Sequence, residues 1–129
     1  MYIKYMISVL IVEDEKSLAS ALSEKLSREG FDVSVESTGE NVFKILKKNP
    51  VDIVLLDLVM PKKTGFKVLE ELEKDPEVRM IPVIVLSGLS DDESIKKALR
   101  LGAVDYFVKT NHPISEVVEK IKAYISKSK

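Results

Sequence analysis

Five polar residues that could take part in chemistry stand at the ends of apolar runs: Glu13, Asp14, Asp57, Ser87 and Lys109. A carboxylate is ionised at neutral pH, so Asp57 could act as a nucleophile without a separate base and form an acyl phosphate. An ammonium and a hydroxyl group can surround the oxygens of a phosphoryl group, where negative charge concentrates. These residue types therefore point to phosphoryl transfer onto a carboxylate.

The three acids suggest a divalent cation. Carboxylates held close together repel one another strongly unless a cation lies between them. No His or Cys lies near Glu13, Asp14 or Asp57 in the sequence, so the ligands would all be hard oxygens. Such ligands favour Mg²⁺, or a similar ion such as Mn²⁺, that retains several waters.

Each of these residues also has an ordinary structural interpretation. Asp57 could cap a turn, because Asp is common in turns. Glu13 and Asp14 could simply begin a helix, Ser87 could be a turn residue and Lys109 a solvated lysine at the end of a strand. Their joint occurrence at successive strand ends favours the chemical interpretation.

Short apolar strands would position these residues. The run IVLL at 53–56 is typical of a strand buried on both faces of a parallel sheet, and Pro61 prevents it from continuing as a central strand. The alternating segment DVSVE fits a half-exposed or edge strand. We expect five strands, at 7–12, 32–36, 53–56, 82–87 and 104–108.

Amphipathic helices would follow the strands, because apolar residues recur there with helical spacing. The expected apolar positions are Leu18, Ala21, Leu22 and Leu26 in the first helix, Phe66, Leu69 and Leu72 in the third, and Ile95, Ala98, Leu99 and Leu101 in the fourth. The sequence SDDE at 90–93 is typical of a helix start with an acidic first turn. Five repeats of strand and helix predict a doubly wound α/β fold with right-handed crossovers. The carboxyl ends of its strands share one edge, so the polar residues should meet in a shallow cleft.

The bulk properties fit one domain and exclude several classes of protein. The chain has 129 residues, a formal net charge of −1 and no Cys, which excludes disulfides, thiolate metal sites and a Cys nucleophile. Nothing in the charge favours nucleic acid or an anionic membrane, and no apolar stretch approaches the ~20 residues of a membrane span. We expect a cytoplasmic domain at 7–127 after a leader at 1–6, with Met6 as an alternative start.

The chain resembles the receiver domain of two-component response regulators, the CheY-like family. The matching features are the acidic pair Glu13-Asp14, DLVMP at 57–61, Gly65, the LSG around Ser87 and DYFVK at 105–109. Five motifs in the expected order, covering nearly all of the chain beyond the leader, make the resemblance specific. It implies a flavodoxin-like (βα)5 fold with a five-stranded parallel sheet in the strand order 2-1-3-4-5.

The resemblance implies a role for each site residue. Asp57 would accept a phosphoryl group from a sensor histidine kinase, a phosphotransfer protein or a small phosphodonor. Asp14 and Asp57 would bind Mg²⁺ directly, together with the backbone carbonyl of Val59, and Glu13 would act through a metal-bound water. Lys109 would pair with the phosphoryl group.

The resemblance also implies a switch. Ser87 would move to hydrogen-bond the phosphoryl group, and Tyr106 would move inward into the space vacated. These movements would couple the charge in the cleft to the surface of the fourth helix, fifth strand and fifth helix. The chain would catalyse its own phosphorylation and dephosphorylation, yet serve as a signalling protein with an unknown downstream target rather than as a metabolic enzyme. We expect neither direct nucleic-acid binding nor a membrane span.

Three features depart from the family pattern. Thr110 replaces the proline that usually follows the active lysine in a cis bond, and the segment 110–113 is slightly longer than the family's loop. A cis bond before a residue other than proline costs about 2.5–4 kcal/mol, so this bond is either trans or strained. Gly88 replaces the usual Ala and loosens the backbone. Val59 and Leu89 are apolar where the family tunes hydrolysis, so we expect a long-lived phosphorylated form.

Three alternative functions share part of the pattern. A flavodoxin-like electron carrier has the same strand order, but it needs a hydroxyl-rich and Gly-rich phosphate loop where this chain has Glu13, Asp14 and Glu15. A haloacid-dehalogenase-like phosphatase needs a second Asp at the position of Val59. A silent pseudo-receiver, acting only as an interaction module, would not need the polar groups that this chain retains.

Overall fold

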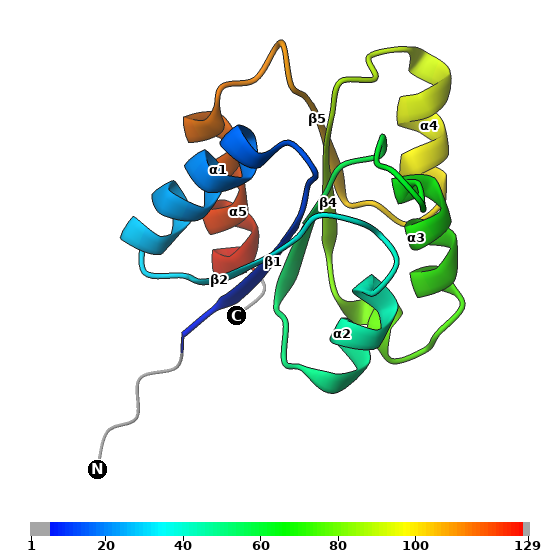
Figure 1. The fold of residues 1–129 in the computed structure, drawn as a ribbon, viewed down its shortest axis with the longest axis horizontal. Helices are drawn as coiled ribbons and strands as arrows, with labels where there is room; N and C mark the ends of the chain where they lie inside the picture. Colours follow the sequence, from blue (N-terminus) through cyan, green and yellow to red (C-terminus); the bar gives the residue numbers. More distant parts are fainter. Residues whose placement is uncertain (1–5, 128–129) are drawn as a thin grey trace.

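One five-stranded parallel sheet in the order β2-β1-β3-β4-β5 forms the centre of the molecule, as predicted (Figure 1). The structure is a computed structural model and describes residues 6–127, so most of the predicted leader lies outside the described residues. The strands are β1 (Ser8–Val12), β2 (Asp32–Glu36), β3 (Ile53–Leu56), β4 (Val83–Ser87) and β5 (Asp105–Val108). β2 and β5 are the edge strands, and the predicted edge strand is indeed β2.

Helices cover both faces of the sheet. They are α1 (Lys16–Arg28), α2 (Val42–Lys48), α3 (Gly65–Glu73), α4 (Asp92–Arg100) and α5 (Ile114–Lys127), with a short 3₁₀ helix, η1 (Val78–Met80), that the sequence analysis did not predict. Helices α1 and α5 lie on one side of the sheet, and α2, α3 and α4 on the other (Figure 1). No helix within residues 6–127 combines the length and the apolar character needed to cross a bilayer.

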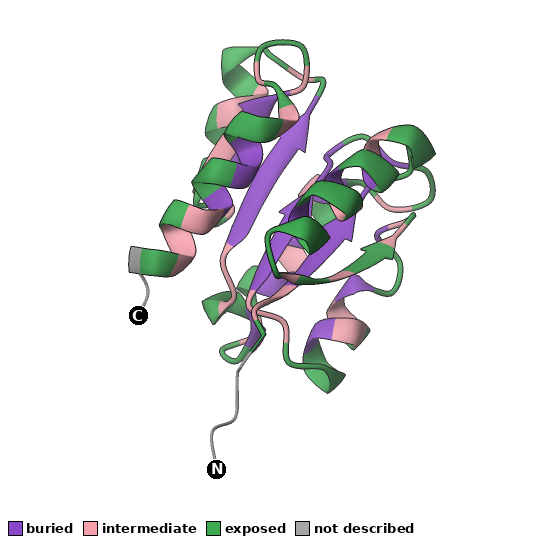
Figure 2. Cartoon of the chain, turned by 90° about the vertical axis from the view of Figure 1, so that its left-hand side faces the viewer, coloured by how far each residue is buried: buried purple, intermediate pink, exposed green. Residues whose placement is uncertain are grey.

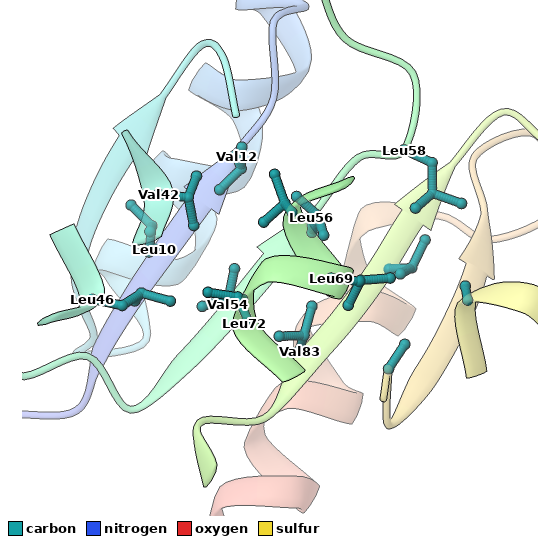
Figure 3. Packing of buried hydrophobic residues seen from close by; sticks show 14 of the residues in the cluster. Leu10, Val12, Val42, Leu46, Val54, Leu56, Leu58, Leu69, Leu72 and Val83 are labelled. Carbon is teal, nitrogen blue, oxygen red and sulfur yellow. The ribbon is translucent and has the colours of Figure 1, made fainter. Parts of the chain in front are cut away.

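The two faces of the sheet build two hydrophobic clusters. Successive side chains of a strand point to opposite faces, so Leu10 and Val54 pack toward α2 and α3 (Figure 3) while Val9 and Ile53 pack toward α1 and α5. β1, β3 and β4 are buried almost throughout, and the outer faces of the helices are exposed (Figure 2). This two-sided burial explains why these strands are unbroken apolar runs.

Two predicted helix faces were partly wrong. In α1 the buried small residue is Ala19, not Ala21, which is exposed. Ala21 lies about 100° around the helix from Leu22, whereas Ala19 lies on the same side as Leu22. In α4 the core contact is Ala98, and the adjacent Leu99 is 44% exposed.

The start of α4 agrees with the sequence. Asp91 is the residue before the first helical turn, and its side chain accepts a hydrogen bond from the Ser94 N–H at 3.0 Å. Asp92 and Glu93 occupy the first turn, where negative charge favours the positive end of the helix dipole. Hydrogen bonding lowers the pKa of Asp91 from its usual 3.8, which keeps the cap ionised at neutral pH.

Candidate functional site

The polar residues of the site lie at the carboxyl edge of the sheet. Glu13 directly follows β1, Asp57 follows β3, Ser87 ends β4 and Lys109 follows β5. The strands are parallel, so their carboxyl ends lie side by side. Glu13, Asp14 and Asp57 each offer a carboxylate oxygen, and these oxygens lie within 4.8 Å of one another.

Lys109 lies between the acids. Its Nζ is 3.0 Å from Oε1 of Glu13, 3.2 Å from Oδ2 of Asp57 and 3.7 Å from Oε1 of Glu15. The side chains of Glu13 and Asp57 are only 3% and 4% exposed, whereas that of Glu15 is 59% exposed. The single ammonium is therefore shared by two buried carboxylates that follow two different strands.

The backbone fixes the second oxygen of each buried carboxylate. Oε2 of Glu13 accepts a hydrogen bond from the Glu15 N–H at 3.1 Å. Oδ1 of Asp57 accepts one from the Val59 N–H at 3.2 Å. Each carboxylate is thus held at one oxygen by its own loop and at the other by Lys109, which fixes its orientation toward the cleft.

Burial and the neighbouring charges shift two pKa values. Burial is the main cause that raises the pKa of Glu13 above its usual 4.5, with a further contribution from the charge of Asp57. Burial alone would lower the pKa of Lys109, but its hydrogen bond to Glu13 and the charge of Asp57 outweigh burial and raise it above 10.5. Lys109 therefore stays protonated, and the acids gain from a further cation.

Gly65 lets the loop after β3 fold closely against Asp57. Its N–H donates to the Leu58 carbonyl at 2.9 Å, and α3 begins at this residue. A Cβ at this position would overlap the backbone carbonyl of Asp57 and lie 2.7 Å from Cα of Leu58. In the same loop Lys62 has a φ of 69°, a left-handed conformation that is unfavourable for a side-chain-bearing residue.

Ser87 and Tyr106 meet at the loop between β4 and α4. Ser87 is fully buried, and its Oγ accepts a hydrogen bond from the Leu89 N–H at 3.2 Å. The Tyr106 hydroxyl donates to the Leu89 carbonyl at 2.7 Å. Burial raises the pKa of the half-buried Tyr106 above 10. Both side chains therefore contact the backbone of the same loop residue.

Two residues near the site were not predicted from the sequence. The sequence shows Glu15 as an acid but does not predict its contact with Lys109. Whether the Glu15 side chain can approach Lys109 depends on where α1 begins. His112 was not considered, yet its ring nitrogen Nδ1 lies 3.1 Å from the Val108 N. A single His carries no spacing pattern that could have indicated this contact. The Lys109–Thr110 bond is trans, since no cis peptide bond occurs among residues 6–127.

The donor set fits a magnesium ion. The candidate ligands are carboxylates only, and within the described part of the chain no other group of acidic, His or Cys residues is placed to hold a metal. Oxygen ligands are those that Mg²⁺ prefers, and it usually needs only a few of them beside its waters. Asp14 is exposed, so one side of the acidic group is open to solvent.

Comparison with known proteins agrees with this geometry. The family model of the response regulator receiver domain matches residues 9–122. The chain is 38% identical over 117 residues to a probable transcriptional regulator of Porphyridium aerugineum, covering 91% of this chain and 47% of the relative. It is 38% identical over 120 residues to the transcriptional regulatory protein CpxR of Klebsiella pneumoniae, covering 93% and 50%. The chain thus spans about half the length of these curated relatives.

Solved structures show the same fold. The receiver domain of a Francisella response regulator superposes with a TM-score of 0.87 at 28% identity, covering 95% of this chain and 99% of the other. The receiver domain of a histidine kinase from Syntrophus aciditrophicus gives a TM-score of 0.85 at 29% identity, covering 95% and 92%. The chain belongs to the family of response regulator receiver domains.

Proposed function

We propose that Asp57 is the phosphoryl acceptor of this receiver domain, in a reaction that depends on Mg²⁺. Asp14, Asp57 and the backbone carbonyl of Val59 would hold the ion directly, and Glu13 would act through a metal-bound water. The observation that carries the proposal is the cluster at the sheet edge, where two buried carboxylates share one ammonium beside a third, open acid. Two of these acids are buried, and Asp57 is the one that follows β3, the middle strand of the sheet, whereas Glu13 follows β1.

In this reaction one carboxylate oxygen of Asp57 attacks phosphorus, and the bond from phosphorus to the donor breaks. The donor would be the phosphohistidine of a sensor histidine kinase or phosphotransfer protein, or a small acyl phosphate, and it leaves with the bonding electron pair. Lys109 would turn from Oδ2 of Asp57 to the new phosphoryl oxygens, which carry more charge. A bound Mg²⁺ would supply further neutralisation of those oxygens.

The same geometry supports a switch at Ser87 and Tyr106. Ser87 ends β4, and Leu89 follows two residues later. The Leu89 N–H donates a hydrogen bond to Oγ of Ser87, and the Leu89 carbonyl accepts one from the Tyr106 hydroxyl. If the Ser87 hydroxyl turns to the phosphoryl group, the Leu89 N–H loses its acceptor and the loop that Tyr106 contacts is free to shift. We propose that this change alters the surface of α4, β5 and α5, where an unidentified protein target would bind.

The proposed setting is a cytoplasmic two-component phosphorelay with residues 7–127 as one receiver domain. The matched relatives include transcriptional regulators, and this chain spans about half of their length. Membership of the receiver family disfavours the flavodoxin-like electron carrier and the phosphatase. The silent pseudo-receiver is the alternative that the experiment must exclude.

Incubation with acetyl phosphate and Mg²⁺, followed by intact-mass spectrometry, tests the proposal. Wild-type protein should gain the mass of one phosphoryl group, and omission of Mg²⁺ should abolish the gain. Asp57→Asn should gain nothing under the same conditions. An unmodified wild-type protein that still folds and binds Mg²⁺ would support the silent pseudo-receiver instead.

A further inference from the structure

The turn that follows β5 folds back on Val108, the residue before Lys109. The N–H groups of Asn111 and His112 both donate to the Val108 carbonyl, at 3.0 and 3.1 Å. The imidazole Nδ1 of His112 lies 3.1 Å from the Val108 N and 3.1 Å from the Val108 O. Both polar backbone groups of Val108 are therefore engaged by the segment that comes directly after the site lysine.

The Val108 N–H needs the His112 ring. β5 is an edge strand, and the Lys109 N–H donates to the Ser87 carbonyl of β4 at 2.8 Å. Because N–H groups alternate in direction along a strand, the Val108 N–H points away from β4, toward a side where no further strand lies within residues 6–127. Val108 is only 6% exposed, so leaving its buried N–H without an acceptor would destabilise the fold.

The protonation pattern of the ring follows from these contacts. A carbonyl oxygen has two lone pairs, and those of the Val108 carbonyl are taken by the two turn N–H groups. The free role for Nδ1 is therefore that of acceptor from the Val108 N–H, which places the ring proton on Nε2. Nδ1 cannot accept this bond while it carries a proton.

The ring of His112 also contacts a core aromatic residue. It packs edge-on against Phe107, with the ring centroids 5.1 Å apart and an interplanar angle of 83°. Phe107 belongs to the core cluster beneath α1 and α5. Directly after His112, the Pro113 carbonyl accepts hydrogen bonds from the N–H groups of Glu116 and Val117. These bonds form the first turn of α5. His112 thus ties the last residues of β5 to the first turn of α5.

We propose that His112 is a positioning residue for Lys109, acting through the bond from the Val108 N–H to Nδ1. This proposal rests on the proposed phosphoryl transfer at Asp57. The peptide between Val108 and Lys109 sets the direction in which the lysine side chain leaves the strand. By fixing Val108, His112 keeps Nζ of Lys109 at 3.0 to 3.2 Å from the buried carboxylates. Residue 110 is Thr rather than proline, so this turn depends on the His112 side chain for its rigidity.

The test compares His112→Leu, which keeps the bulk of the side chain without an acceptor, with His112→Asn, whose amide oxygen can replace Nδ1. The rate of phosphorylation by acetyl phosphate should fall about tenfold in His112→Leu. It should stay within about twofold of wild type in His112→Asn, because an acceptor remains. The Kd for Mg²⁺ should be unchanged in both variants, since the acids are untouched. If His112 only stabilised the fold, the phosphorylation rate would instead fall equally in both variants.

Equal rates in wild type and His112→Leu would overturn the positioning role, as would a rate in His112→Asn as low as that in His112→Leu. A wild-type protein that acetyl phosphate does not modify would overturn the proposed function itself. The ¹⁵N spectrum of the imidazole in wild-type protein gives a second readout that needs no variant. In the neutral imidazole it should show the proton on Nε2, and a neutral ring with its proton on Nδ1 would contradict the proposal.

Discussion

Nζ of Lys109 lies 3.2 Å from Oδ2 of Asp57, although the two residues are 52 positions apart in the chain. The contact spans the sheet from β5 to β3, across β4. The same Nζ lies 3.0 Å from Oε1 of Glu13, the residue that directly follows β1. One ammonium therefore links the ends of three strands, and it holds two buried acids that would otherwise repel each other.

Lys109→Met should destabilise the protein without Mg²⁺. The variant keeps the apolar stem of the lysine but leaves the buried carboxylates of Glu13 and Asp57 without a cation. We expect the free energy of unfolding to fall by about 2 kcal/mol, and Mg²⁺ to restore most of the loss because it neutralises the same acids. Urea unfolding with and without Mg²⁺ measures both values. A variant as stable as wild type in the absence of Mg²⁺ would show that the ion pairs contribute little.

Mg²⁺ binding should weaken as the pH falls. Burial raises the pKa of Glu13 above 4.5, so a proton competes for this carboxyl at pH values where a free glutamate would be ionised. Protonation of Glu13 stabilises the folded state, because the pKa of Glu13 is higher there than in the unfolded chain. This stabilisation is complete below pH 4.5, the usual pKa, and is lost as the pH rises through the pKa of the folded state. We therefore expect the Kd for Mg²⁺ to rise as the pH falls toward 4.5, and to begin rising at a higher pH than a free glutamate would give.

Isothermal titration of Mg²⁺ at several pH values measures this dependence. Glu13→Gln is the matched control, because its amide does not titrate in this range. Its Kd should be weaker at neutral pH and should vary less with pH. The same slope in wild type and Glu13→Gln would assign the proton to another group.

Gly65→Ala should be costly, whereas Gly88→Ala should not. A Cβ at Gly65 would overlap the carbonyl of Asp57, so the loop next to the acceptor must shift. A Cβ at Gly88 meets nothing within 4 Å. We expect Gly65→Ala to lower the free energy of unfolding by about 2 kcal/mol. Gly88→Ala should raise it by up to about 1 kcal/mol, because the unfolded chain loses freedom.

Thermal and urea unfolding compare these two glycine variants directly. The phosphorylation rate with acetyl phosphate is a second readout, and it should fall only in Gly65→Ala. Equal effects of the two substitutions would mean that the close approach of Gly65 to Asp57 is not required.

The phosphorylated form should be long-lived in wild-type protein. Val59 is 57% exposed beside Asp57, and Leu89 lies at the loop that Tyr106 contacts, so neither side chain offers a polar group to an attacking water. Introducing Val59→Asn and Leu89→Glu together should speed the loss of phosphate by about tenfold, because an oriented water reacts faster. Intact-mass spectrometry over time follows the loss, and an unchanged half-life would contradict this explanation.

The sheet was predictable because its central strands are buried on both faces. Such strands appear in the sequence as unbroken apolar runs, and their ends mark the site. The first residue of the fourth run, Pro82, is not part of β4, since proline has no N–H to donate to a strand. The convergence of Glu13, Asp57 and Lys109 followed from the same rule, because parallel strands end at one edge.

Side-chain contacts that depend on loop geometry were not predictable. The choice between Ala19 and Ala21 depends instead on the angular position of each residue relative to Leu22, and a small alanine adds little to the apolar pattern that marks a buried helix face. The contact of His112 with Val108 depends on the path of a four-residue return, for which no periodic pattern exists. The distance of Glu15 from Lys109 likewise depends on the start of α1.

Chemical trapping of the acyl phosphate tests the central claim most directly. Borohydride reduces an aspartyl phosphate to homoserine, so protein treated with acetyl phosphate and Mg²⁺ and then reduced carries a permanent mark at the acceptor. Peptide mass spectrometry locates that mark. We predict homoserine at position 57 and at no other acidic residue, and none when Mg²⁺ is omitted. Homoserine at Asp14 or another aspartate, the longer alcohol 5-hydroxynorvaline at Glu13 or another glutamate, or no reduced residue in wild-type protein would contradict the assignment of Asp57.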